Sequence, residues 1–128
     1  MLRKKLLCVE DDNINAFIME KLLAEEFDFS VAINGEDCLK MISDDHFDVI
    51  LLDINLGRGN RDGIQVLQQI RSTPGYNSIP IFAITSYALP GDEEKFLQTG
   101  FDSYFSKPVD KAKLISQIKR ISNDRSQE

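Results

Sequence analysis

Apolar residues recur along this chain in two alternating patterns, short continuous runs and longer segments with apolar positions at helical spacing. Short apolar runs are typical of buried strands, and helical spacing indicates amphipathic helices. The runs predict strands at about 5–9, 29–33, 47–52, 79–84 and 103–106. The segments between and after them predict helices at about 13–26, 36–43, 62–71, 90–100 and 110–122.

Strands that alternate with helices in this way indicate βαβ units and a parallel sheet. We therefore expect the α/β fold class, with one doubly wound domain over residues 1–128. The chain contains no internal repeat or linker that would divide it. Residues 123–128 are polar, and we expect them to form a frayed tail.

The predicted helices carry apolar stripes, as amphipathic helices do. Asp12 or Asn13 is suited to cap the first helix, because a short polar side chain there accepts a free backbone N–H. The stripes are Ile14, Phe17, Ile18 and Leu22 in the first helix, Cys38, Leu39 and Ile42 in the second, Ile64, Val66, Leu67 and Ile70 in the third, and Leu114, Ile118 and Ile121 in the fifth.

Composition and charge exclude several classes of protein. The hydrophobic content of 42% and the charged content of 28% are those of an ordinary globular protein. The net charge of −6 argues against direct nucleic-acid binding, which requires a basic face. No apolar run approaches the ~20 residues of a membrane span, and the basic start of the chain is followed by a strand rather than a signal peptide. We therefore expect a cytoplasmic protein.

Cys8 and Cys38 lack metal or disulfide spacing and are expected to be buried.

Polar residues with complementary chemistry follow four of the predicted strands. Glu10 and Asp11 follow the first strand, Asp53 the third, Thr85 the fourth and Lys107 the fifth. In a parallel sheet all carboxyl ends lie at one edge, so these side chains are expected to converge. The group would comprise three carboxylates, a hydroxyl and an ammonium.

Each of these residues suits a chemical role and also has an ordinary structural alternative. Asp53 can attack phosphorus and form an acyl phosphate, although it could merely cap the following turn. Glu10 and Asp11 would cluster with Asp53 and demand a counter-ion such as Mg2+, although acids also favour helix N-termini. Lys107 would pair with phosphoryl oxygens, or with Asp53 when no phosphoryl group is bound. The structural alternative is that Lys107 and Pro108 simply form a surface turn. Thr85 can donate to a phosphoryl oxygen or simply end a strand.

At this point the chain resembles the response-regulator receiver domains of two-component signalling, of the chemotaxis-regulator type. The resemblance extends over essentially the whole length of the chain. The family fold is flavodoxin-like, a five-stranded parallel sheet in the order 2-1-3-4-5 flanked by five helices. The matching motifs are Val9-Glu10-Asp11, Ile50-Leu51-Leu52-Asp53, Asp62-Gly63, Ile84-Thr85-Ser86, Gly100-Phe101-Asp102 and Lys107-Pro108.

The resemblance implies that the protein is a phosphoacceptor switch rather than a conventional enzyme. Asp53 would accept a phosphoryl group from a histidine kinase or a histidine phosphotransfer protein. Asp11 and Asp53 would bind Mg2+ directly, Glu10 through water, and Asn55 through its backbone carbonyl. Lys107 would bind the phosphoryl group, and Thr85 and Tyr104 would act as switch residues. The resemblance also implies that the Lys107–Pro108 peptide bond is cis.

The resemblance also implies a downstream protein partner that binds the face made by the fourth helix, the fifth strand and the fifth helix. A phosphorylation-dependent homodimer is a further expectation. The start at Met1 favours a stand-alone chain over a receiver excised from a hybrid kinase. Two departures from the family pattern stand out. Residues 56–61 form a loop that lacks proline, looks two residues longer than usual and carries Arg58 and Arg61, and Ser86 replaces a frequent alanine.

Three other functions compete with this interpretation. An aspartate-nucleophile phosphatase of the haloacid dehalogenase type needs a general acid two residues after the nucleophile, where this chain has Asn55. An FMN carrier would need a hydroxyl-rich phosphate loop after the first strand, where this chain has Glu10, Asp11 and Asp12. A phosphorylation-independent receiver usually lacks one member of the catalytic set, and none is missing here.

Overall fold

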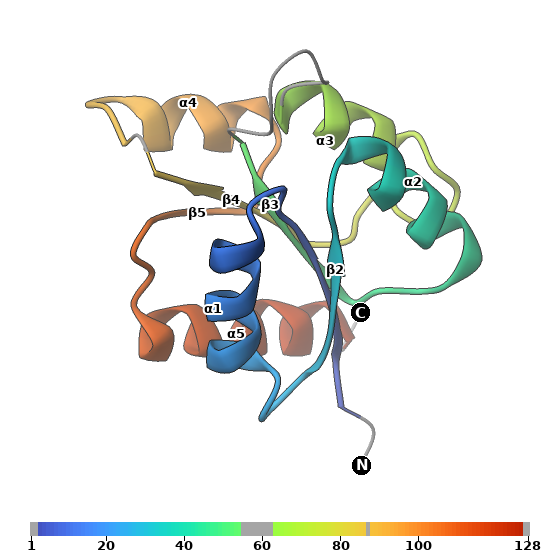
Figure 1. Ribbon diagram of the computed structural model, residues 1–128. Coiled ribbons are helices and arrows are strands. Elements are labelled where there is room, and N and C mark those ends of the chain that lie inside the picture. The colour runs from blue at the N-terminus through green and yellow to red at the C-terminus, as the bar shows by residue number, and fades with distance from the viewer. Residues whose placement is uncertain (1–2, 55–62, 87, 127–128) are drawn as a thin grey trace.

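The computed structural model describes residues 3–54, 63–86 and 88–126. Its centre is a parallel sheet with the strand order β2-β1-β3-β4-β5, as expected (Figure 1). The strands are β1 (Lys5–Val9), β2 (Asp28–Ala32), β3 (Val49–Asp53), β4 (Ile81–Thr85) and β5 (Ser103–Ser106).

Each strand is followed by a helix. The helices are α1 (Asn13–Leu23), α2 (Gly35–Asp44), α3 (Gly63–Arg71), α4 (Asp92–Thr99) and α5 (Lys111–Ser126). In the described part of the chain no helix is long and apolar enough to cross a membrane.

Several boundaries differ from the expectation by a few residues, and two of the differences have a physical reason. β4 begins at Ile81 instead of residue 79, because Pro80 has no N–H to donate and contributes only its carbonyl, which accepts from Ile50 N at 3.0 Å. α5 continues to Ser126 instead of ending near residue 122. Once its first turns are packed, each further residue adds a backbone hydrogen bond, so polar residues extend the helix instead of forming an irregular tail.

The core consists of two apolar clusters, one on each face of the sheet. Figure 1 shows α1 and α5 together on one side of the sheet and α2 and α3 on the other. Successive residues of a strand point to opposite faces. Leu6 of β1 therefore packs with α1 and α5, whereas its neighbour Leu7 packs with α2 and α3. Because β1, β3 and β4 are covered on both faces, their sequences are almost wholly apolar.

Both cysteines are free and buried in these clusters, as expected. Burial raises the pKa of the Cys8 thiol to about 12, and the nearby Glu10 carboxylate adds to the effect. The pKa of Cys38 is also raised to about 12, by burial first and by Asp37 second. Both thiols therefore behave as small apolar groups.

Most of the apolar stripe of α1 does not face the sheet, although Leu22 packs against the core. Met19 and Leu23 are the buried residues of this helix, and Asp12 caps it by accepting from two backbone N–H groups. Ile14, Phe17 and Ile18 are instead 72%, 56% and 49% exposed. The sheet and α5 cover only one narrow side of α1, so a helix this rich in apolar residues leaves a second apolar side in water. The stripe is a surface feature of the molecule.

The Gly100-Phe101-Asp102 motif joins α4 to β5 and is tied down by α3. Asp102 Oδ2 accepts from Ile81 N at 2.8 Å and from the Arg71 guanidinium at 2.9 Å. The same guanidinium donates to the carbonyl of Gly100 at 3.2 Å. Phe101 is buried in the core beside these bonds. The loop after α4 is therefore fixed to the body of the protein, which makes it a firm anchor for one end of that helix.

Gly63 begins α3 and lies against the backbone just after β3. A Cβ at this position would lie 2.6 Å from the Ile54 Cα atom. We expect Gly63→Ala to lower the free energy of unfolding by roughly 1–3 kcal/mol, because backbone must shift to admit the methyl group. Urea denaturation measures the loss. Gly35→Ala is the control, since its Cβ would meet only a methyl of Val66 and should cost less. A larger loss for Gly35→Ala would contradict this packing.

Candidate functional site

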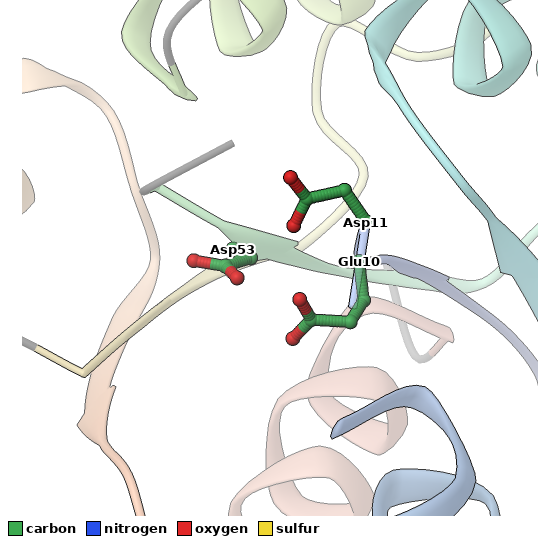
Figure 2. Close-up of side chains that lie close together, drawn as sticks. All are labelled: Glu10, Asp11 and Asp53. Atoms are coloured by element: carbon green, nitrogen blue, oxygen red, sulfur yellow. The ribbon is translucent and has the colours of Figure 1, made fainter. Parts of the chain in front are cut away.

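Three carboxylates meet at the carboxyl edge of the sheet (Figure 2). Asp53 is the last residue of β3, and Glu10 and Asp11 directly follow β1. These two strands are neighbours, and their register pairs Val9 with Leu52, which brings Glu10 level with Asp53. One oxygen from each carboxylate lies within 4.8 Å of the others. Glu10 and Asp53 are buried, and Asp11 lies at the surface.

Lys107 extends from the end of β5 to the two buried acids. Its Nζ lies 3.2 Å from Asp53 Oδ2, so the predicted pairing with Asp53 is present. The ammonium also lies 2.5 Å from Glu10 Oε1, a contact that the sequence pattern did not suggest. The backbone N–H of Lys107 donates to the carbonyl of Thr85 at 2.7 Å, which fixes the residue against β4. The bond from Lys107 to Pro108 is cis, as the resemblance implied.

The charges at this site are out of balance. Burial raises the pKa of Glu10 to about 7, and the neighbouring Asp53 contributes to the rise although Lys107 opposes it. Burial alone would lower the pKa of Lys107, but its bond to Glu10 and the charge of Asp53 outweigh burial and raise it. One ammonium thus cannot compensate three acids at this edge, and the site favours an additional cation.

Thr85 and Tyr104 lie on β4 and β5, the two strands on the side of Asp53 away from β1. Thr85 ends β4, next to β3, and its side chain is buried. Tyr104 lies in β5, pairs with Ala83, and packs toward the cluster of α2 and α3. Its ring stacks on Phe96 of α4. The two residues that the resemblance implied as a switch therefore occupy adjacent strands between the acidic cluster and α4.

Two expectations concern residues outside the described ranges. One is the binding of Mg2+ by the backbone carbonyl of Asn55, and the other is the long loop over residues 56–61. Of the expected metal-binding residues, Glu10, Asp11 and Asp53 are brought together.

The donor set fits a hard divalent cation. Carboxylate oxygens are the ligands that Mg2+ prefers, and it usually binds through one or two carboxylates while keeping several waters. Here one carboxylate, Asp11, is exposed to water, and two are held in the body of the protein. The cluster offers no sulfur or imidazole ligand among the described residues, so a softer metal is not favoured.

A groove that the sequence analysis missed opens beside the acidic cluster. Its volume is about 500 Å³, and Ile18 and Leu22 of α1 form one wall. Lys107, Ser86 and Val109 form part of the remaining lining. The signal was present in the sequence, since α1 has more apolar positions than one buried face requires. Only the fold reveals that these positions border the same lysine that pairs with Asp53.

The comparisons with known proteins agree with this fold. Residues 6–119 match the family described as the response regulator receiver domain. The chain therefore belongs to the receiver-domain family of two-component signalling.

Particular relatives are similar over nearly the whole chain. The polar-differentiation response regulator DivK of Brucella ovis is 30% identical over 94% of this chain and 98% of its own length. The receiver domain of the sensor histidine kinase PA1611 of Pseudomonas aeruginosa, solved with a magnesium ion in its active-site cleft, is 29% identical with a TM-score of 0.84, covering 94% of this chain and 98% of that one. The chemotaxis protein CheY4 of Vibrio cholerae, 22% identical over 92% of this chain and 98% of its own, shares the fold with a TM-score of 0.81.

The raised pKa of Glu10 generates a prediction about stability and pH. Glu10 is protonated more readily in the folded protein, at a pKa of about 7, than in the unfolded chain, where 4.5 is usual. The metal-free folded protein therefore binds more protons, and its free energy of unfolding should fall as the pH rises from about 5 to 7. Urea denaturation at several pH values measures this slope.

Two comparisons isolate the contribution of Glu10 to that slope. Glu10→Gln removes the titrating group and should flatten the pH dependence over this range. Excess Mg2+ should flatten it as well, because a cation favours the ionised carboxylate. An identical slope in the wild type and in Glu10→Gln would contradict the assignment.

Proposed function

We propose that this protein is a Mg2+-dependent phosphoacceptor switch. In this proposal Asp53 accepts a phosphoryl group from the phosphohistidine of a histidine kinase or histidine phosphotransfer protein. The main support is the contact of Lys107 Nζ with Asp53 Oδ2 at 3.2 Å, within a cluster that also holds Glu10 and Asp11. That arrangement holds a nucleophilic carboxylate between a cation site and a phosphate-binding ammonium.

The residues divide the chemistry among themselves. A carboxylate oxygen of Asp53 attacks phosphorus as the bond from phosphorus to the histidine nitrogen breaks, and the imidazole leaves with the bonding electrons. Lys107 moves from the carboxylates to a phosphoryl oxygen, where its charge stabilises the transition state. Asp11, Asp53 and the backbone carbonyl of Asn55 would hold Mg2+ directly and Glu10 would hold it through water, and the ion would supply positive charge to offset that of the phosphoryl group. Hydrolysis of the acyl phosphate restores Asp53, so the protein is a switch rather than a conventional enzyme.

The phosphorylated state changes the side of the molecule where α4, β5 and α5 meet. The Thr85 hydroxyl donates to the new phosphoryl oxygen, and Tyr104 moves in response. The change is then passed to a downstream protein that binds the α4-β5-α5 face, or to a second copy of this chain. Such a response couples local charge to a surface with two arrangements. A cytoplasmic location would give it access to kinase domains.

The alternative functions have less support. A haloacid-dehalogenase-type phosphatase needs an acid where the chain has Asn55, whose amide cannot protonate a leaving group. A phosphorylation-independent module would not need Lys107 and three acids held at one edge, with a raised pKa at Glu10. Turnover of p-nitrophenyl phosphate would favour the first alternative, and wild-type protein that takes up no label would favour the second.

Substitution of the nucleophile tests the proposal. We expect acetyl phosphate with Mg2+ to label the wild type and to leave Asp53→Asn unlabelled, because an amide oxygen is a poor nucleophile. Mass spectrometry detects the added phosphoryl group, and a chelator should prevent its addition. Asp12→Asn is the matched control, since this nearby acid caps α1 and should not be needed. Labelling of Asp53→Asn at the wild-type level would refute the assignment.

The exposed stripe of α1 is the proposed docking surface for the phosphodonor protein. Ile18 and Leu22 line the groove that ends at Lys107, so a protein that presents phosphohistidine to Asp53 would cover it. Ile14 and Phe17 extend the apolar surface along the same helix. Exposed apolar groups of this kind mark interaction sites when they are contiguous. An apolar helical surface on the donor would complement them.

Removing this stripe should separate docking from chemistry. We expect the double variant Phe17→Ala/Ile18→Ala to slow transfer from a phosphohistidine protein by roughly tenfold or more, the effect of losing one or two anchor residues. Its labelling by acetyl phosphate should match that of the wild type, because the small donor needs no docking surface. Radiolabelled transfer assays measure both rates. Leu89→Ala, which truncates an exposed apolar residue outside α1, should leave both rates unchanged. Parallel loss of both rates would argue against docking on α1.

A further inference from the structure

We infer that the groove between β5 and α5 is the docking site for an acidic segment of the downstream partner protein. The inference deepens the proposed function and rests on it, because it names the chemistry of the partner that the α4-β5-α5 face would bind. The groove has a volume of about 440 Å³ and is lined by Phe105 of β5 and by Ala112, Lys113, Ser116 and Gln117 of α5. β5 is the outermost strand of the sheet, so the groove lies along one edge of the molecule (Figure 1).

Hydrogen-bond donors occupy one stripe of α5 along this groove. The stripe consists of residues at helical spacing, namely Lys113, Ser116, Gln117 and Arg120. An ammonium, a hydroxyl, an amide and a guanidinium can all donate hydrogen bonds, and the two charged groups have no acceptor. The stripe is therefore complementary to carboxylate oxygens, which accept hydrogen bonds and carry negative charge.

The guanidinium of Arg120 is held in place by a chain of hydrogen bonds. Its Nε and Nη2 atoms lie 3.2 and 2.7 Å from Gln117 Oε1. The same amide donates from its Nε2 atom to the hydroxyl oxygen of Ser103 at 2.7 Å, and Ser103 is a buried residue of β5. This chain fixes the direction of the guanidinium and leaves its Nη1 group to bind a ligand. A charged group that is oriented in advance loses less side-chain entropy on binding.

The positive charge of the stripe is not used within the fold. Neither Lys113 nor Arg120 has a carboxylate partner among the described residues, whereas Lys119 of the same helix lies 2.6 Å from Glu26 Oε1. Lys113 also lies in the first turn of α5, where the helix dipole disfavours a cation. Asp110, which accepts from Lys113 N at 3.1 Å, offsets only part of that charge. The stripe is thus a positive patch on a protein whose net charge is −6.

An acidic protein segment fits this groove better than other anions do. Phe105 is half-buried and Ala112 is exposed, so the groove presents apolar surface beside the donors, which inorganic phosphate would leave in water. Nucleic acid would be repelled by the net charge of −6, whereas a short segment with few acids would interact mainly with the charges within a Debye length. The partner therefore places one apolar side chain against Phe105 and a carboxylate against Arg120.

A selection from a random library of displayed peptides tests the chemistry of the partner. The target is the wild-type protein with Mg2+ and beryllofluoride, which mimics a phosphoryl group on the carboxylate. We expect the enriched peptides to combine acidic and apolar residues. Their affinity, measured by fluorescence anisotropy, should fall by roughly tenfold in Arg120→Gln, the effect of losing one arginine at an interface. The affinity for the wild type should also weaken as salt is added, because salt screens exposed charges.

Three further variants make the test specific to the groove. Lys119→Gln is the matched control, because it removes one positive charge from the same helix at a residue that pairs with Glu26, and it should leave the affinity unchanged. Gln117→Leu keeps the charge of Arg120 but removes the bonds that orient it, so it should weaken binding by a smaller factor. Arg120→Glu should abolish binding of the acidic peptides and should bind counterparts that carry lysine in place of each acid.

The outcomes distinguish a failure of this inference from a failure of the proposed function. If acetyl phosphate with Mg2+ labels the wild type but the selection enriches no acidic peptide, this inference fails and the phosphoacceptor proposal stands. Equal weakening by Arg120→Gln and Lys119→Gln would overturn the inference in the same way. If the wild type takes up no label, the phosphoacceptor proposal fails, and the inference about its downstream partner fails with it. A wild-type dimer that Arg120→Glu dissociates, detected by light scattering, would show that the groove binds a second copy of this chain instead of a different protein.

Discussion

The electrostatic repulsion among Glu10, Asp11 and Asp53 is the constraint on which the rest of this protein depends. The backbone of two adjacent strands forces these acids together, and hydrophobic burial of both faces of the sheet leaves the backbone no freedom to separate them. Repulsion is tolerated because Lys107 reaches in from β5 and because Glu10 can hold a proton. The folded protein thus keeps a region of high free energy at the carboxyl edge of its sheet, which is where we propose that phosphorylation takes place.

The fold and much of the site could be predicted from the sequence, because both follow from local patterns. Runs such as Val49-Ile50-Leu51-Leu52 specify strands buried on both faces, and parallel strands necessarily bring their final residues together. The positions of Asp53 and Lys107 were predictable for that reason. The contact between Lys107 and Glu10 was not, because the conformation of a long side chain depends on three-dimensional neighbours rather than on spacing.

The errors of sequence-based prediction occurred where a periodic pattern has two structural solutions. The stripe of α1 has ideal helical spacing, but spacing does not say which side of a helix meets the sheet. Met19 and Leu23 take the buried side, Leu22 is half-buried beside them, and Ile14, Phe17 and Ile18 remain exposed to water. The orientation of Tyr104 is a similar case, because its stack on Phe96 depends on how α4 lies beside β5. In both cases tertiary packing decides, and both features are ones that we connect with function.

The burial of both native cysteines has a practical consequence for studies in solution. Thiolates, not thiols, react with maleimide reagents, and the thiols of Cys8 and Cys38 are both inaccessible and held at a pKa of about 12. The wild-type chain is therefore equivalent to a cysteine-free background at neutral pH. A single cysteine introduced on the exposed side of α4 would carry a fluorophore or spin label without competing modification. The proposed movement of that helix could then be tested in an otherwise unaltered protein.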